Sequence, residues 1–139
     1  MPVVFEHPVR FEEVDPAGIV FFARYFNWCH LAMEHFFDGV AGGYVDLITR
    51  RKIGFPTVHI TADWKAPLRY GDVVQIATAV TKIGTTSFTF RYELTRKSDK
   101  VHVATVDHVV VASDLPTTTK IAIPSDVRSL LESHRASAA

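Results

Sequence analysis

The stretch RYFNWCHLAMEHFF, residues 24–37, decides the fold of this chain. Polar residues recur there at helical spacing and form one narrow stripe that reaches just past its end: Asn27, His30, Glu34 and Asp38. The remaining surface is apolar, and its large side chains are Tyr25, Phe26, Trp28, Leu31, Met33, Phe36 and Phe37. Because so wide an apolar face is unstable in water, the pattern predicts a helix that is enclosed on most sides.

Outside this helix the apolar residues recur mainly with a period of two, which is typical of strands. Strands are predicted at residues 3–13, 58–66, 73–83, 87–94 and 101–112, with a short one near 120–123. In residues 58–66 the apolar set is Val58, Ile60, Ala62 and Trp64. Further helices are expected at residues 44–52 and 125–133, and Ser125 is the expected N-cap of the last one.

The order of these elements predicts the α+β class, with a long antiparallel sheet wrapped around one central helix. A single helix cannot cover so wide a sheet, and the strand meander leaves sheet edges unpaired. Dimerisation, for example by edge pairing, would remove both problems.

Length and composition favour one soluble domain over residues 1–139, with a tail at residues 133–139 that is expected to fray. The formal net charge is zero, from 15 basic and 15 acidic side chains, which argues against a nucleic-acid partner. The single cysteine, Cys29, cannot form an internal disulfide, and no signal peptide or membrane-spanning stretch is evident. A cytoplasmic protein without membrane insertion is therefore expected.

The segment that carries chemistry is RFEEVDPAGIVFF, residues 10–22. Asp15 follows a predicted strand and precedes a Pro/Gly turn and the start of the apolar helix. A carboxylate near the free N–H groups of a helix start could attack, or activate water, while those N–H groups stabilise an oxyanion. On pattern alone the simpler interpretation is that Asp15 is a turn residue or a cap, because Asp is common there.

The run Asp15-Pro16-Ala17-Gly18-Ile19-Val20, with Tyr25 and Trp28 in the next helix, resembles the 4-hydroxybenzoyl-CoA thioesterase family of hotdog-fold enzymes. The similarity extends to Gly54-Phe55-Pro56-Thr57 and to Ser87-Phe88. It implies a hotdog fold and hydrolysis of an acyl-coenzyme A (acyl-CoA) thioester. Asp15 would be the catalytic nucleophile or general base, and the backbone N–H of Phe22 would polarise the thioester carbonyl.

The same resemblance implies where the substrate lies and how the chain assembles. Substrate contacts are expected from Tyr25, Phe26, Phe55, Pro56, Thr57 and Thr86. The family forms homodimers, and often homotetramers, with active sites between subunits, so Phe55, Pro56 and the Thr86 hairpin would come from a neighbouring subunit. No metal and no cofactor are expected, since CoA is part of the substrate.

Two departures from the family pattern affect the mechanism and the binding of CoA. Many relatives carry a His seven residues after the Asp, where this chain has Phe22, so Asp15 must act without it. A basic cluster that holds the CoA phosphates is replaced by Gly84, Thr85 and Thr86. Possible substitutes are Lys65, Lys82, Arg91 and the run Arg50-Arg51-Lys52, although a solvated charged face explains each of them as well.

Several alternatives stay open. The acyl group could be aromatic or a short to medium aliphatic chain, and the donor could be an acyl carrier protein in place of CoA. A domain that binds acyl thioesters without hydrolysing them is a second class, and a hotdog hydratase is a third. The seven His residues form no metal motif, Cys29 lies in the apolar helix as an expected core residue, and no G-x-S-x-G, P-loop or dinucleotide motif occurs.

Overall fold

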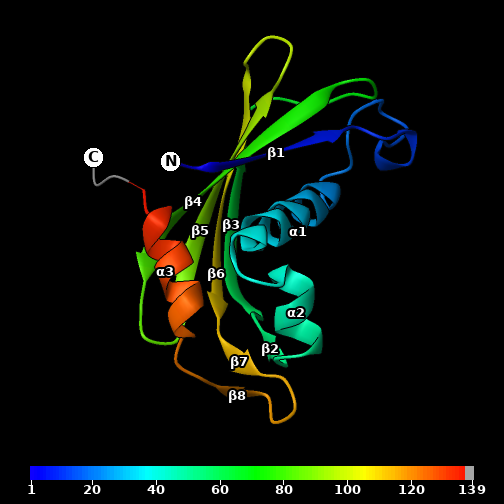
Figure 1. Cartoon of the computed structure of the whole chain (residues 1–139). Helices are drawn as coiled ribbons and strands as arrows, with labels where there is room; N and C mark the ends of the chain where they lie inside the picture. The colour runs from blue at the N-terminus through cyan, green and yellow to red at the C-terminus, as the bar shows by residue number, and fades with distance from the viewer. Residues whose placement is uncertain (137–139) are drawn as a thin grey trace.

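The computed structural model describes residues 1–136, and its centre is a five-stranded antiparallel sheet in the order β1-β4-β5-β6-β3 (Figure 1). The strands are β1 (Val3–Pro8), β3 (Thr57–Trp64), β4 (Val73–Ile83), β5 (Ser87–Arg96) and β6 (His102–Val111). Helix α1 (Arg24–Phe36) lies against the inner face of this curved sheet. The predicted α+β arrangement, a long antiparallel sheet around one helix, is confirmed.

Shorter elements cover the ends of the sheet. They are the 3-10 helices η1 (Phe11–Glu13) and η2 (Phe37–Gly39), helices α2 (Gly43–Thr49) and α3 (Ser125–Ser133), and a small sheet of β2 (Ile53–Gly54), β7 (Ser113–Asp114) and β8 (Thr119–Lys120). Helix α2 and the small sheet lie at the end of the molecule away from the η1 segment (Figure 1). No helix within residues 1–136 is long and apolar enough to cross a membrane.

The core forms where α1 meets the inner rows of the sheet. Helix α1 buries one side of its surface through Tyr25, Trp28, Cys29, Ala32, Met33 and Phe36. On β5 the residues of the inner row, Phe88, Phe90, Tyr92 and Leu94, are almost completely buried. The ring of Phe90 lies 5.1 Å from that of Phe36, which joins sheet and helix. Each such side chain stabilises the fold by about 1.5–3 kcal/mol through burial.

Cys29 belongs to this core. Its burial raises the pKa of the thiol to about 12. The side chain is therefore a protonated, apolar packing group at neutral pH.

The first strand is shorter than predicted, because it ends at Pro8 and not at Glu13. Pro8 pairs with Val73 at the end of the β1–β4 ladder. The chain then forms η1, in which the Glu13 carboxylate accepts the Arg10 N–H at 2.7 Å. A side chain that bonds to nearby backbone offers an alternative to strand pairing, and alternation alone does not reveal it.

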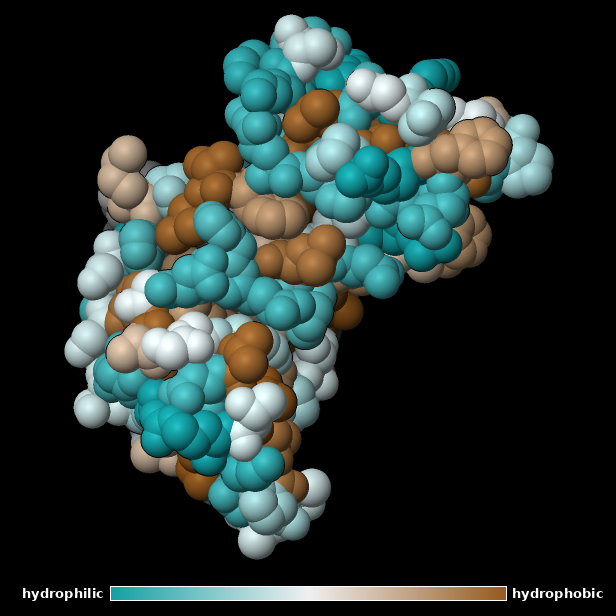
Figure 2. Space-filling view, turned by 45° about the vertical axis from the view of Figure 1, so that its right-hand side comes forward, coloured by the Kyte–Doolittle hydropathy of each residue, from teal (hydrophilic) through white to brown (hydrophobic). Residues whose placement is uncertain are grey.

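Edge strand β3 exposes apolar side chains that the sheet would be expected to bury. Val58, Ile60 and Trp64 are 58%, 37% and 40% exposed. Helix α1 packs mainly against β1 and β4, towards the other edge of the sheet, and leaves most of β3 uncovered. Figure 2 turns the side that carries α1 and α2 towards the viewer. It shows apolar patches within a largely hydrophilic surface. Such surface beside an unpaired edge is typical of an interaction site.

Strict alternation along residues 101–112 predicts that His102 and His108 share one face of β6, but the structure places them on opposite faces. His108 pairs with Phe90 and is buried, whereas His102 pairs with Thr95 and is exposed. The ladder between β5 and β6 shifts register between Leu94 and Thr95. Such an irregularity adds a residue to one strand and changes which side its neighbours face.

The last helix starts as predicted, but Ser125 does not cap it. The N-cap position is Pro124, and no side chain bonds to the helix start. Part of the tail that was expected to fray is ordered, because the Ala136 N–H donates to Val80 O at 2.7 Å and His134 Nδ1 lies 2.8 Å from Met1 O. Residues 137–139 lie outside the described part of the chain.

Candidate active site

Asp15 lies at the base of a tight loop that connects Val14 and Val20, which form an antiparallel bridge. The Asp15 N–H donates to Ile19 O, and the Gly18 N–H donates to Asp15 O, both at 2.9 Å. Gly18 has φ of +82°, a conformation that side chains disfavour. The Asp15 Oδ1 accepts the Ala17 N–H at 2.9 Å. Asp15 is thus the turn residue that its sequence context suggests, and within residues 1–136 its second oxygen has no protein donor.

The start of α1 supplies free backbone donors close to this loop in sequence. The Phe21 N–H donates to Glu13 O at 3.0 Å, and the N–H groups of Arg24 and Tyr25 donate to Phe21 O and Phe22 O. The N–H groups of Phe22 and Ala23 find no acceptor within the described residues. Unpaired donors at a helix start are favourable partners for an oxyanion. The structure therefore leaves the Phe22 N–H, expected to polarise the thioester, unengaged.

A buried carboxylate that sequence reasoning missed holds these parts together. Glu13 is 8% exposed, and its carboxylate accepts the Trp28 indole N–H and the Arg10 N–H, each at 2.7 Å. His7 Nε2 lies 3.1 Å from both of its oxygens. Burial opposes ionisation, but these hydrogen bonds outweigh it and lower the pKa of Glu13. One side chain thereby joins β1, the Asp15 loop and α1.

An apolar cavity of about 330 Å³ opens beside this loop. It is lined by Ile19, Val20, Phe22, Tyr25, Trp64, Lys65, Ala66 and Pro67. The rings of Tyr25 and Phe26 stand edge-on to Trp64, at 5.8 and 6.0 Å between centroids. Trp64, which sequence reasoning treated only as a strand residue, is the centre of this aromatic group. The predicted substrate residues Tyr25 and Phe26 therefore do lie together near the helix start.

The other predicted substrate residues lie at the opposite end of the molecule, within the same chain. The end of β6 joins them, because the Val111 N–H donates to Pro56 O at 3.1 Å and the Ala112 N–H donates to Thr86 O at 2.7 Å. The ring of Phe55 is buried and stacks on Phe37 at 5.0 Å. Phe55 and Pro56 also border a second cavity of about 430 Å³ beside α2. A single chain therefore does not bring this group to Asp15.

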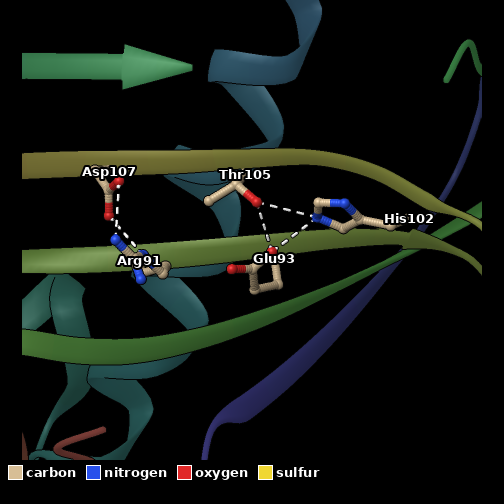
Figure 3. A network of polar contacts seen from close by, with 5 residues as sticks. All are labelled: Arg91, Glu93, His102, Thr105 and Asp107. Carbon is tan, nitrogen blue, oxygen red and sulfur yellow. Dashed lines mark hydrogen bonds and ion pairs between the residues drawn. The ribbon is translucent and has the colours of Figure 1, made fainter. Parts of the chain in front are cut away.

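All three arginines proposed as phosphate ligands are already paired with carboxylates. Arg91 donates to Asp107 at 2.8 Å on the outer face of the sheet, beside the network of Glu93, His102 and Thr105 (Figure 3). Arg50 pairs with Asp46, and Arg51 with Asp126. Lys65 and Lys82 have no ion pair within residues 1–136, and Lys65 lines the aromatic cavity. No cluster of metal-binding side chains occurs among these residues.

A buried histidine, His108, lies on the inner face of the sheet, between the two ends of the molecule that hold the predicted substrate residues. His108 Nε2 lies 2.6 Å from Thr57 Oγ1, and its Nδ1 lies 3.0 Å from Tyr92 Oη. Burial, with a smaller effect from His30, lowers the pKa of His108 to about 4. The imidazole is therefore neutral at physiological pH, and neither neighbour is a charged group that could favour its protonation.

This histidine is expected to make the fold acid-sensitive between pH 6.5 and 4. The unfolded chain takes up the proton at the ordinary pKa of 6.5, but the folded chain only near 4, so stability falls as pH falls through this window. The loss is at most about 3 kcal/mol. Urea unfolding at several pH values measures it, and His108→Gln should show a shallower dependence. Equal slopes for both proteins would contradict this assignment.

Comparison with solved structures gives the fold class. A gentisyl-coenzyme A thioesterase is 30% identical, with a TM-score of 0.83 over 93% of this chain and 99% of that chain. A mutant 4-hydroxybenzoyl-CoA thioesterase complexed with 4-hydroxybenzoyl-CoA is 24% identical, with a TM-score of 0.84 over 93% and 97% of the two chains, which shows a shared fold. The molecule is a hotdog-fold thioester hydrolase.

The sequence relatives place it more closely. The chain belongs to the thioesterase-like superfamily, whose model matches residues 9–131. The 1,4-dihydroxy-2-naphthoyl-CoA hydrolase of Nostoc punctiforme is 31% identical over 135 residues, which cover 97% of this chain and 90% of that protein. The resemblance to hotdog thioesterases noted in the Asp15 segment is thereby confirmed.

Proposed function

We propose that this protein hydrolyses a hydroxylated aromatic acyl-CoA, such as 1,4-dihydroxy-2-naphthoyl-CoA, to the free acid and CoA. The observation that carries the proposal is the aromatic cavity around Trp64, placed beside the Asp15 loop and the free N–H of Phe22. Flat aromatic walls suit a ring better than a flexible chain. The hydrolase from Nostoc punctiforme, and the gentisyl-coenzyme A and 4-hydroxybenzoyl-CoA enzymes, are named for aromatic acyl groups.

In this proposal the chemistry is divided between one side chain and the backbone. The carbonyl oxygen of the thioester accepts the Phe22 N–H, which stabilises the negative charge that develops there. The free oxygen of Asp15 either attacks the carbonyl carbon or takes a proton from the water that does so. If Asp15 acts as the base, water adds to the carbonyl carbon, the carbon–sulfur bond breaks, and the proton that Asp15 took from water passes to the departing CoA thiolate. If Asp15 attacks, the carbon–sulfur bond breaks to leave an anhydride on Asp15, and water then hydrolyses this anhydride to the free acid and supplies the proton of the CoA thiol.

A panel of thioesters tests this proposal. Thiol release is measured for 1,4-dihydroxy-2-naphthoyl-CoA, 4-hydroxybenzoyl-CoA, hexanoyl-CoA and an acyl carrier protein thioester. The aromatic CoA esters should be hydrolysed with kcat/KM at least about 10-fold above the others, since a matched pocket discriminates by this much or more. Preference for the carrier protein or the aliphatic ester would refute the substrate class. No release from any ester would favour a binding protein.

The proposed active enzyme is a homodimer joined through β3. The two edges of the sheet are β1 and β3. Strand β1 is short and ends at Pro8, and proline is typical of edges that stay unpaired. Strand β3 is longer and presents the apolar side chains of Val58, Ile60 and Trp64. Pairing of two β3 strands would satisfy the backbone and cover this surface; a tetramer would need a further contact between such dimers.

Light scattering is expected to give at least twice the chain mass of 15.5 kDa. Ile60→Lys, which places like charges close together near the proposed two-fold axis, should shift the mass to that of one chain and lower activity. Val45→Lys is the matched control, because Val45 is exposed on α2, away from β3. A wild-type monomer with full activity would contradict the shared site.

A further inference from the structure

The two most exposed aromatic side chains of residues 1–136 lie next to each other. Phe11 of η1 is 75% exposed and Tyr70 is 63% exposed, and their rings meet edge to face at 5.7 Å between centroids. Neither ring belongs to the core or lines the aromatic cavity. Apolar residues that are exposed singly are normal on a protein surface, but contiguous rings are typical of a binding surface.

An arginine precedes each of these rings, and both arginines are free. Arg10 and Arg69 are exposed, and neither forms an ion pair within residues 1–136. All other arginines of the chain are engaged by a carboxylate or by a backbone carbonyl. The neighbouring carboxylates are Glu12, which is exposed, and Asp72, whose Oδ2 accepts the Arg69 N–H at 2.8 Å. Together with the rings, the two free arginines form an arginine–aromatic patch: Arg10, Phe11, Arg69 and Tyr70.

Backbone hydrogen bonds hold this patch next to the Asp15 loop. The Val9 N–H donates to Asp72 O at 2.9 Å, which joins the chain before η1 to the turn that carries the second ring. The Val20 N–H, at the end of the Asp15 loop, donates to Leu68 O at 2.9 Å. The patch therefore lies at the end of the molecule where α1 starts, which is also the end that holds Asp15 (Figure 1).

The chain also limits the distance from the patch to the aromatic cavity. Pro67 lines the cavity and Tyr70 follows it by three residues, so their Cα atoms are at most about 11 Å apart. By the same reasoning the Cα atoms of Phe11 and Asp15, four residues apart, are separated by at most about 15 Å. A ligand whose thioester lies at Asp15 can therefore reach the patch through a long, flexible arm such as pantetheine.

The patch has the chemistry that the nucleotide end of CoA requires. Adenine stacks on aromatic rings, and a guanidinium binds phosphate oxygens through paired N–H donors. The positions that hold the phosphates in the resembled family are occupied here by Gly84, Thr85 and Thr86, none of which is basic. The three arginines first considered as substitutes are paired with carboxylates, whereas those of the patch are free.

We propose that the arginine–aromatic patch is the subsite for the nucleotide of CoA, with adenine on the rings and the phosphates on Arg10 and Arg69. The inference rests on the proposed function and deepens it, because it names CoA, and not an acyl carrier protein, as the recognised carrier. The patch lies away from the reacting atoms, so its contacts are the same in the ground state and in the transition state. It therefore lowers KM for CoA esters and leaves kcat unchanged.

The test compares two esters of one acyl group, 4-hydroxybenzoyl-CoA and 4-hydroxybenzoyl-pantetheine, which lacks the nucleotide. In the double variant Arg10→Ala, Arg69→Ala, kcat/KM for the CoA ester should fall about 10²-fold through KM, about 10-fold for each charge-assisted hydrogen bond. The pantetheine ester should be hydrolysed as before, which also shows that the variant is folded. Tyr70→Ala should lower kcat/KM about 10-fold for the CoA ester alone, through loss of stacking. Added salt should raise KM for the CoA ester only.

Arg135→Ala is the matched control, because Arg135 is an exposed arginine that follows α3, on the other side of the molecule from η1 (Figure 1). It should change neither ester. Equal losses on both esters in the double variant, or an unchanged CoA ester, would overturn this inference but leave the proposed hydrolase intact. The same acyl group on an acyl carrier protein is the third substrate, and a loss confined to that ester would also overturn the inference, since the patch would then dock a protein. A wild-type enzyme that hydrolyses none of the three esters would instead refute the proposed function.

Discussion

Replacement of Asp15 by asparagine is expected to lower kcat by at least about 10²-fold without unfolding the protein. Asparagine keeps a side-chain oxygen at the position that accepts the Ala17 N–H at 2.9 Å, so the loop should survive. It removes the negative charge on the oxygen that has no protein donor. An amide can neither attack the thioester nor accept a proton from water, so the loss should appear in kcat.

Steady-state thiol release and circular dichroism measure the two halves of this expectation. Glu12→Gln is the matched control, because Glu12 is an exposed carboxylate in the same segment and its loss tests for a general effect of charge. It should change kcat by less than about 3-fold, in line with a weakly coupled surface charge. Near-normal turnover in Asp15→Asn would remove Asp15 from the mechanism.

The second large effect is expected at Glu13. Glu13→Ala leaves the Trp28 indole N–H and the Arg10 N–H without their acceptor, together with the His7 imidazole. Loss of a buried, hydrogen-bonded carboxylate should lower the free energy of unfolding by about 3 kcal/mol. Because Glu13 also joins the Asp15 loop to α1, turnover should fall by up to about 10²-fold from misplacement of the reacting groups.

Glu13→Gln separates the two effects. It keeps one oxygen acceptor and the shape of the side chain, so it should retain most of the stability and part of the activity. Urea unfolding and kcat are measured for both variants near neutral pH. The lowered pKa of Glu13 implies that its contribution is present above pH 4.5 and is lost as pH falls further, below most of the His108 window. Wild-type stability in Glu13→Ala would show that the cluster is dispensable.

Sequence patterns predicted an element correctly where each face of that element lies in one kind of environment, either apolar or polar. The apolar surface of residues 24–37 predicted the bounds of α1 almost to the residue, but within one chain the helix buries one side and not most of its surface, since Leu31 stays exposed. The bounds of β4, which runs from Val73 to Ile83, are also as predicted. The first strand was overextended, because the bonds from Glu13 to Arg10 and Trp28 depend on chain segments that alternation does not record.

The sequence by itself determined the α+β fold, the central helix, the Asp15 turn and the resemblance to hotdog thioesterases. All of these depend on neighbours in the chain or on a short motif. Only the tertiary structure decided that Trp64 centres the aromatic cavity, that Glu13 ties the loop to α1, and that His108 links Tyr92 to Thr57. Each of these arises from contacts between strands and helices far apart in the sequence, and spacing along a chain does not encode which distant side chains meet.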